Sequence, residues 1–206
     1  ERQGWIAQAE CTEIRIPLPE QIRHEYAVAD SKAKFRIASE NDGKVEIARR
    51  LIARHCEDRI LIIGQYLDQL EKVAEEFGAP IITGRTPNKD RERIYRDFKE
   101  GRIPVLIVSK VANFSVDLPD ASVAIQISGT FGSRQEEAQR LGRILRPKNN
   151  GNMAHFYTLV TQDTRERDFA GKRQLFLTEQ GYRYRIVNDL DALDESGADS
   201  QALQKA

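Results

Sequence analysis

The residues best suited to chemistry lie in one short run, Gln139-Arg140-Leu141-Gly142-Arg143-Ile144-Leu145-Arg146. On a helix with about 100° per residue, the side chains of Gln139, Arg143 and Arg146 lie within roughly 60° of one another. One amide and two guanidinium groups would then face the same place. Planar guanidinium groups bind phosphate oxygens through paired hydrogen bonds, so this run predicts a helix face that contacts phosphate.

A structural interpretation of the same run stays open at this point. Arg146 directly precedes Pro147, where a helix is expected to end, and arginines near a helix C-terminus interact favourably with the helix dipole. Gly142 permits the close approach of another backbone, which serves packing as well as ligand binding. The run alone does not decide between the two interpretations.

The elements that must position this run alternate along the chain between short apolar segments and amphipathic segments. Strands are expected at 59–63, 80–82, 105–108, 123–127 and 154–159, and helices at 45–52, 67–77, 86–98, 135–145 and 164–179. Thr86 is expected to be the N-cap of its helix, with Pro87 as the first helical residue. This alternation predicts an α/β fold with a mostly parallel sheet flanked by helices, in which ligands bind at the carboxyl ends of the strands.

Several segments together resemble a known family. The run QRLGRILR is similar to motif VI of superfamily two helicases, Q-x-x-G-R-x-x-R, while ILIIGQY (60–66) resembles motif IV and VLIVSKVANFSVDLP (105–119) resembles motif V. With IQISGTFGSRQEEAQRLGRILRPK (125–148), FYTLVTQDT (156–164) and KRQLFLTEQGY (172–182), the chain resembles the XPB type of DNA helicase in its bacterial form. The chain departs from the family pattern at Ala112-Asn113, where many members carry Gly-Asp.

The resemblance implies a RecA-like C-terminal lobe of an ATP-dependent 3′–5′ DNA helicase or translocase that acts in DNA repair or transcription. By the same match, Arg143 and Arg146 would reach the γ-phosphate of ATP as arginine fingers, with Gln139, Gly142 and Asp117 near the nucleotide. Two other functions stay open: an ATP-dependent duplex remodeller that does not separate strands, and a non-catalytic module that binds DNA or a partner protein.

A DNA track is expected at the carboxyl ends of three strands. The loops after Ile63, Ile82 and Val108 carry polar residues, and the resemblance to the helicase motifs directs these loops toward DNA phosphates. The residues that we expect to contact DNA are Gln65, Thr83, Gly84, Ser109 and Lys110.

The phosphate-binding half of an ATP site is missing from the sequence. A P-loop needs Gly-x-x-x-x-Gly-Lys-Ser/Thr, and Gly43-Lys44 lacks both the preceding glycine and the hydroxyl residue. We therefore expect ATP and Mg²⁺ to bind mainly to an N-terminal helicase lobe in cis, and the 206-residue chain alone to be inactive. The three histidines have no ligand spacing, so no metal site is expected in this chain.

Charge and composition divide the chain into three parts. A neutral total conceals a basic block, residues 133–185, with eleven Lys/Arg against six Asp/Glu, and a C-terminal stretch with one Lys against five acids. We expect a lead-in from the inter-lobe region at 1–41, the helicase lobe at 42–185 and an acidic, disordered tail at 186–206. Glu1 is expected to be a boundary within a longer protein.

The remaining expectations concern the cell. The longest apolar runs are four residues, too short to cross a bilayer, and Cys11 and Cys56 have no metal or redox spacing. We therefore expect an intracellular protein with no membrane contact, and the family resemblance implies a monomer in the bacterial cytoplasm, associated with the nucleoid. DNA is the expected ligand, and a nuclease or a repair complex is a candidate partner.

Overall fold

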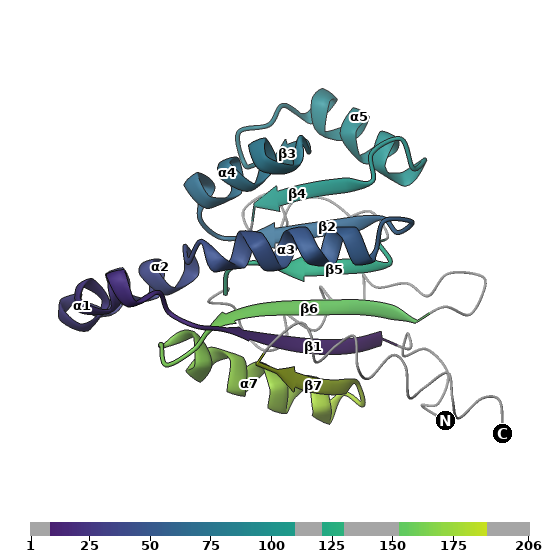
Figure 1. The fold of residues 1–206 in the computed structure, drawn as a ribbon. Helices are drawn as coiled ribbons and strands as arrows, with labels where there is room; N and C mark the ends of the chain where they lie inside the picture. Colours follow the sequence, from purple (N-terminus) through teal and green to yellow (C-terminus); the bar gives the residue numbers. More distant parts are fainter. Residues whose placement is uncertain (1–8, 110–120, 130–152, 189–206) are drawn as a thin grey trace, which may run out of the picture.

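The computed structural model describes residues 9–109, 121–129 and 153–188, and these residues form one parallel β-sheet with helices on both faces (Figure 1). The strand order is β3-β4-β2-β5-β6-β1-β7, and every neighbouring pair is parallel. The strands are β1 (Ala9–Ile16), β2 (Ile60–Gly64), β3 (Ile81–Ile82), β4 (Val105–Ser109), β5 (Val123–Gln126), β6 (Ala154–Thr161) and β7 (Arg183–Val187). The predicted fold class, α/β with a mostly parallel sheet flanked by helices, is confirmed.

The described helices are α1 (Glu20–Val28), α2 (Ser31–Ser39), α3 (Gly43–Arg54), α4 (Leu67–Phe77), α5 (Asn88–Lys99) and α7 (Glu166–Glu179). α3 and α4 cover one face of the sheet and α5 and α7 the other, whereas α1 has no buried residue and contacts α2. One core cluster joins Leu51 of α3 and Val73 of α4 to one face of the central strands. The other joins Phe98 of α5 and Leu177 of α7 to the opposite face.

Burial on both faces explains why the central strands are continuously apolar. Every residue of β2 and β4 is buried, with alternate side chains entering the two core clusters. This is the pattern from which the sequence predicted strands at 59–63 and 105–108, and both are confirmed.

The predicted lead-in, residues 1–41, shares the sheet of the lobe. Its β1 lies between β6 and β7, with Ile14 aligned to Leu159 on one side and to Val187 on the other. The boundary at residue 41 therefore does not separate two folding units. The predicted start of the tail likewise falls inside β7, which includes Ile186 and Val187. The local sequence does not show either pairing, because a strand is defined by its pairing partners as well as by its residue pattern, and the partners of β1 and β7 are distant in sequence.

A smaller correction concerns the start of α5. The helix begins at Asn88 with Pro87 at the N-cap, and no side chain caps it. Thr86 does not cap the helix, because its Oγ1 accepts a hydrogen bond from the backbone N–H of Thr83 at 2.9 Å. The predicted helix at 135–145 lies outside the described residues. Among the helices that the structure describes, none is long and apolar enough to span a membrane.

Candidate functional site at the carboxyl edge of the sheet

The predicted DNA-contacting residues lie along one edge of the sheet, because parallel strands all end on the same side. Gly64 of β2 aligns with Ser109 of β4, and Ile82 of β3 aligns with Val108. Gln65 and Thr83 directly follow their strands, so the structure brings Gln65, Thr83 and Ser109 to the ends of three neighbouring strands. Whether they contact DNA stays a prediction.

The turn from β2 into α4 is held tightly at Gly64. A Cβ at this position would lie 2.6 Å from Cδ2 of Leu70 and 3.1 Å from Oγ of Ser128, so a larger residue would displace its neighbours. That Ser128 hydroxyl accepts a hydrogen bond from the backbone N–H of Gln65 at 2.7 Å. The start of the loop is therefore fixed to the end of β5, and Gln65 has a defined backbone position.

Two side-chain groups on this edge are buried without a hydrogen-bond partner among the described residues. The hydroxyl of Ser109 and Oε1 of Gln65 both have this character, and Ser109 is only 2% exposed. Buried polar groups in folded proteins are almost always paired, so these two are candidates for a contact with water or a ligand. We call the side chains of Gln65 and Ser109 the open edge.

The turn from β3 into α5 is closed by its own side chains. The hydroxyl of Thr83 accepts from the backbone N–H of Arg85 at 3.2 Å, and the guanidinium of Arg91 donates to the carbonyls of Thr83 and Thr86, each at 3.3 Å. Gly84 lies at the tip of this turn. The loop shape is thus preset, and the uncapped start of α5 follows it directly.

A second cluster of polar side chains lies at the carboxyl edge, and its members form hydrogen bonds with one another. Nζ of Lys44 lies 2.8 Å from each carboxylate oxygen of Glu166, which also accepts from the backbone N–H of Thr161 at 2.9 Å and from Oγ of Ser39 at 3.0 Å. Asn41 completes it by donating to Oγ1 of Thr161 at 3.3 Å. We call these five residues the closed network.

The closed network lies deep inside the protein and joins four elements. Lys44 is fully buried, and Glu166 is 4% exposed. Burial lowers the pKa of Lys44, while the Glu166 carboxylate acts in the opposite direction. The network connects α2, α3, β6 and α7, so its polar groups serve the packing of these elements.

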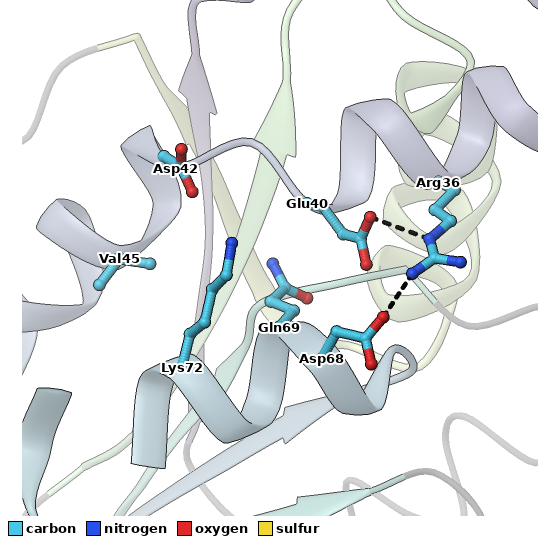
Figure 2. A pocket seen from close by; sticks show the side chains of 7 residues that line it. All are labelled: Arg36, Glu40, Asp42, Val45, Asp68, Gln69 and Lys72. Carbon is cyan, nitrogen blue, oxygen red and sulfur yellow. Dashed lines mark hydrogen bonds and ion pairs between the residues drawn. The ribbon is translucent and has the colours of Figure 1, made fainter. Parts of the chain in front are cut away.

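Two pockets open near this edge. The first, of about 180 Å³, is lined by Arg36, Glu40, Asp42, Val45, Asp68, Gln69 and Lys72 (Figure 2). Its arginine is already engaged, because Arg36 pairs with Glu40 at 2.9 Å and with Asp68 at 2.6 Å. Figure 2 shows Arg36 between these two carboxylates, so the contact joins α2 to the start of α4.

The second pocket, of about 470 Å³, is aromatic and basic. It is lined by Ser31, Lys32, Phe35, Gln65, Tyr66, Arg165 and Phe169. We call it the aromatic pocket. Sequence reasoning missed it, along with Ser128 and the closed network, because its residues come from segments far apart in the chain and match no motif.

The other predicted site residues lie outside the described residues. These are Gln139, Gly142, Arg143 and Arg146 of the predicted finger helix, with Asp117 and Lys110. No group of His, Cys, Asp and Glu that could hold a metal ion is found in the described part of the chain.

Comparison with known proteins gives a consistent family signal. A family model described as "ERCC3/RAD25/XPB C-terminal helicase" matches residues 1–205. The chain is 51% identical over 203 residues to a Kineococcus radiotolerans protein named "DNA 3'-5' helicase XPB", covering 98% of this chain and 36% of that protein. A Mycobacterium tuberculosis protein of the same name is 50% identical over 193 residues, covering 94% of this chain and 35% of that protein. The chain thus spans about a third of the length of these relatives.

Solved structures agree on the fold. The C-terminal domain of the DEAD-box protein Dbp5 has a TM-score of 0.65 at 14% identity, covering 92% of this chain and 95% of that one. Saccharomyces cerevisiae Dbp5 bound to RNA and ADP BeF3 has a TM-score of 0.64 at 15% identity, covering 96% of this chain and 45% of that one. At such identities the likeness concerns the fold, which is that of a RecA-like helicase lobe.

Proposed function

Because the chain belongs to the ERCC3/RAD25/XPB C-terminal helicase family, we propose that it is the second RecA-like lobe of an ATP-dependent 3′–5′ DNA helicase or translocase acting in DNA repair or transcription. The observation that carries this proposal is the sequence identity of 51% and 50%, over nearly the whole chain, to two proteins named "DNA 3'-5' helicase XPB". The RecA-like fold supports the proposal, since such a helicase would be built from two lobes of this fold.

In this proposal the lobe supplies the arginine half of an ATP site. Arg143 and Arg146 would contact the γ-phosphate across the cleft between the lobes, and Gln139, Gly142 and Asp117 would lie near the nucleotide. The support is the motif Q-x-x-G-R-x-x-R in residues 139–146. ATP with Mg²⁺ would supply the free energy for movement, bound mainly by the N-terminal lobe.

The DNA track would run along the carboxyl edge of β3, β4 and β2. The open edge offers a buried hydroxyl and an amide oxygen without partners, and the Thr83–Gly84 turn and Lys110 flank it in sequence. Hydroxyl, amide and ammonium groups are the usual contacts to phosphate and sugar, and such contacts position a strand without reading its sequence. A track of this kind suits an enzyme that moves along DNA.

The most direct test of the ATP role is Arg146→Ala in the full-length protein. We expect ATP turnover to fall by roughly a thousandfold or more while ATP binding stays near normal, because a finger meets charge that develops as the γ-phosphoryl group leaves. Arg146→Lys should rescue little, since an ammonium group does not reproduce the planar fork. Near-normal turnover in Arg146→Ala would contradict the finger assignment.

A control separates this effect from general loss of charge. Arg167 lies on α7 in an exposed pair with Asp163, so Arg167→Ala should leave turnover unchanged. If instead Arg146→Ala lowers the melting temperature with only a mild kinetic loss, the residue has a structural role at a helix end. The isolated 206-residue chain should show no DNA-stimulated ATP hydrolysis.

Whether the enzyme separates strands is a distinct question. A helicase releases a labelled strand from a forked duplex, whereas a translocating remodeller displaces a third strand from a triplex without opening the duplex. A non-catalytic module does neither. Running both assays with the full-length protein distinguishes the three functions.

A further inference from the structure

The aromatic pocket is built by three segments that meet at the carboxyl edge. Ser31, Lys32 and Phe35 come from α2, Gln65 and Tyr66 from the loop after β2, and Arg165 and Phe169 from the start of α7. The volume, about 470 Å³, lies in the range of pockets that hold small molecules or single groups. One of its residues, Gln65, also belongs to the open edge.

The phenylalanine rings of the aromatic pocket are held in place by contacts with one another and with the backbone. The ring centroids of Phe35 and Phe169 lie 5.4 Å apart at 84°, an edge-to-face contact. Phe35 is 2% exposed and packs against Gly129, where a Cβ would lie only 3.1 Å from its Cζ. Phe169 is half-buried at the start of α7.

The third ring, Tyr66, is also oriented. The guanidinium of Arg36 lies 5.6 Å from its ring centroid, and burial raises the pKa of its phenol, which stays neutral at physiological pH. Lys172 lies 5.8 Å from the ring centroid of Phe169. Each of these two rings therefore has a cation beside it.

The lining is basic and contains no carboxylate. Lys32 and Arg165 form no ion pair within the described residues, and both are exposed. Two acids nearby already have partners: Asp30 accepts the backbone N–H groups of Lys32 and Ala33, and Asp163 pairs with Arg167. The pocket therefore favours an anionic ligand over a cationic one.

We propose that the aromatic pocket binds one unstacked base of the DNA strand that follows the carboxyl edge. Phe169 and Tyr66 offer ring surfaces to the base, Lys32 and Arg165 contact the flanking phosphates, and the side chain of Gln65 borders the base. Stacking and cationic grooves are the means by which proteins bind single strands without sequence preference. This inference rests on the proposed DNA function and adds a position at which the strand is held by a base.

An abasic scan of the full-length protein tests the proposal. A fluorescent forked duplex, whose junction fixes the register of the bound strand, carries a single abasic site in its oligothymidylate 3′ arm. The abasic site is moved one nucleotide at a time, and the Kd is measured for each DNA. A base pocket predicts a loss of affinity of roughly five- to a hundred-fold at one position and little loss elsewhere. A track that contacts only phosphates predicts a flat profile, and that result would overturn the base pocket while leaving DNA binding intact.

Substitutions at Phe169 separate stacking from packing. Phe169→Tyr should keep the position-dependent loss, whereas Phe169→Leu and Phe169→Ala should flatten the profile by weakening binding of the intact strand. Melting temperatures are measured on the same samples. If Phe169→Leu keeps the full profile, the residue serves apolar packing, for instance against a protein partner, and the proposal is wrong.

Two matched pairs of cations supply controls. Lys32→Ala should weaken DNA binding more than Lys34→Ala, because Lys34 lies on the same helix but does not line the pocket. Arg165→Ala should likewise weaken DNA binding more than Arg167→Ala does. Equal effects within both pairs would overturn the proposed phosphate contacts. No DNA binding by the unaltered full-length protein would overturn the proposed function itself, which is a different outcome from a flat profile.

Discussion

The closed network and the open edge lie at the carboxyl side of the same parallel sheet, yet they satisfy their polar groups in different ways. In the closed network the Glu166 carboxylate accepts from three residues, and its partner Lys44 is fully buried. In the open edge the Ser109 hydroxyl is nearly as deeply buried but has no partner among the described residues. Burial alone therefore does not distinguish these two groups, whereas their hydrogen-bond partners do.

The difference assigns different consequences to mutation. Removing a member of the closed network leaves a buried donor or charge unpaired, which costs stability. Removing a group of the open edge deletes an atom that was already unpaired, so stability should hold while ligand binding suffers.

Glu166→Gln should cause the largest loss of stability. The substitution leaves the buried Lys44 ammonium without its counter-charge, and breaking a buried pair in this way costs roughly 3–5 kcal/mol of unfolding free energy. Denaturant unfolding measures the loss. Glu179→Gln, at an exposed position on the same helix, is the matched control and should change stability by less than about 0.5 kcal/mol.

The same variant should show a pH dependence of known sign. Burial already lowers the pKa of Lys44 below the ordinary value of 10.5, and loss of Glu166 would lower it further. The unfolded state then binds more protons than the folded state, so the stability of Glu166→Gln should rise as the pH increases toward 10.5. A stability that falls over this range would contradict the assignment of Lys44 as a buried cation.

The double variant Lys44→Met/Glu166→Gln should be more stable than Glu166→Gln alone. Methionine removes the unpaired charge, while the glutamine oxygen can still accept from the backbone N–H of Thr161. A double-mutant cycle should give a coupling energy of roughly 0.5–3 kcal/mol. Additive effects would mean that the two side chains do not act as a pair.

Gln65→Ala should weaken single-stranded DNA binding by the full-length protein by roughly three- to ten-fold, the value of about one hydrogen bond, without lowering its melting temperature. Gln69→Ala is the matched control, because Oε1 of Gln69 is also buried without a partner, whereas its amide nitrogen donates to the carbonyl of Ser39 at 2.6 Å and so contributes to the fold. It should lower the melting temperature and leave DNA affinity unchanged. An equal loss of DNA affinity in both variants would mean that Gln65 and Gln69 do not differ in their contact with DNA.

Cysteine reactivity gives the smallest and simplest readout. Cys11 on β1 is buried and burial raises its thiol pKa to about 12, whereas Cys56 is exposed. At pH 8, a thiol reagent should label Cys56 quickly and Cys11 only upon unfolding. Rapid labelling of Cys11 in the native protein would mean that the sheet opens locally where β1 pairs with β6 and β7.

The sequence predicted the centre of this fold well and its margins less well. The central strands were predictable because continuous apolar runs such as Ile60–Ile63 mark strands buried on both faces. The position of β1 between β6 and β7 was not, since pairing depends on residues more than a hundred positions away. β7 is only partly buried, and its residues carry no strong pattern.

The candidate site was likewise predictable only in part. Motifs and strand ends placed Gln65, Thr83 and Ser109 on one edge, because parallel topology fixes where strands end. Nothing local predicted that Lys44 and Glu166, 122 positions apart, would pair, or that Phe35 would meet Phe169. Contacts of that range follow from the packing of helices, which a single sequence does not specify.

One comparison of two buried serines tests the central claim most directly. Ser39 is fully buried and donates to Glu166 at 3.0 Å, while Ser109 is 2% exposed and unpaired among the described residues. Each is changed to alanine in the full-length protein, and both the melting temperature and the Kd for single-stranded DNA are measured. We expect Ser39→Ala to lower the melting temperature with an unchanged Kd, and Ser109→Ala to raise the Kd several-fold with an unchanged melting temperature. A Ser109→Ala protein that binds DNA normally and melts at a lower temperature would contradict the account.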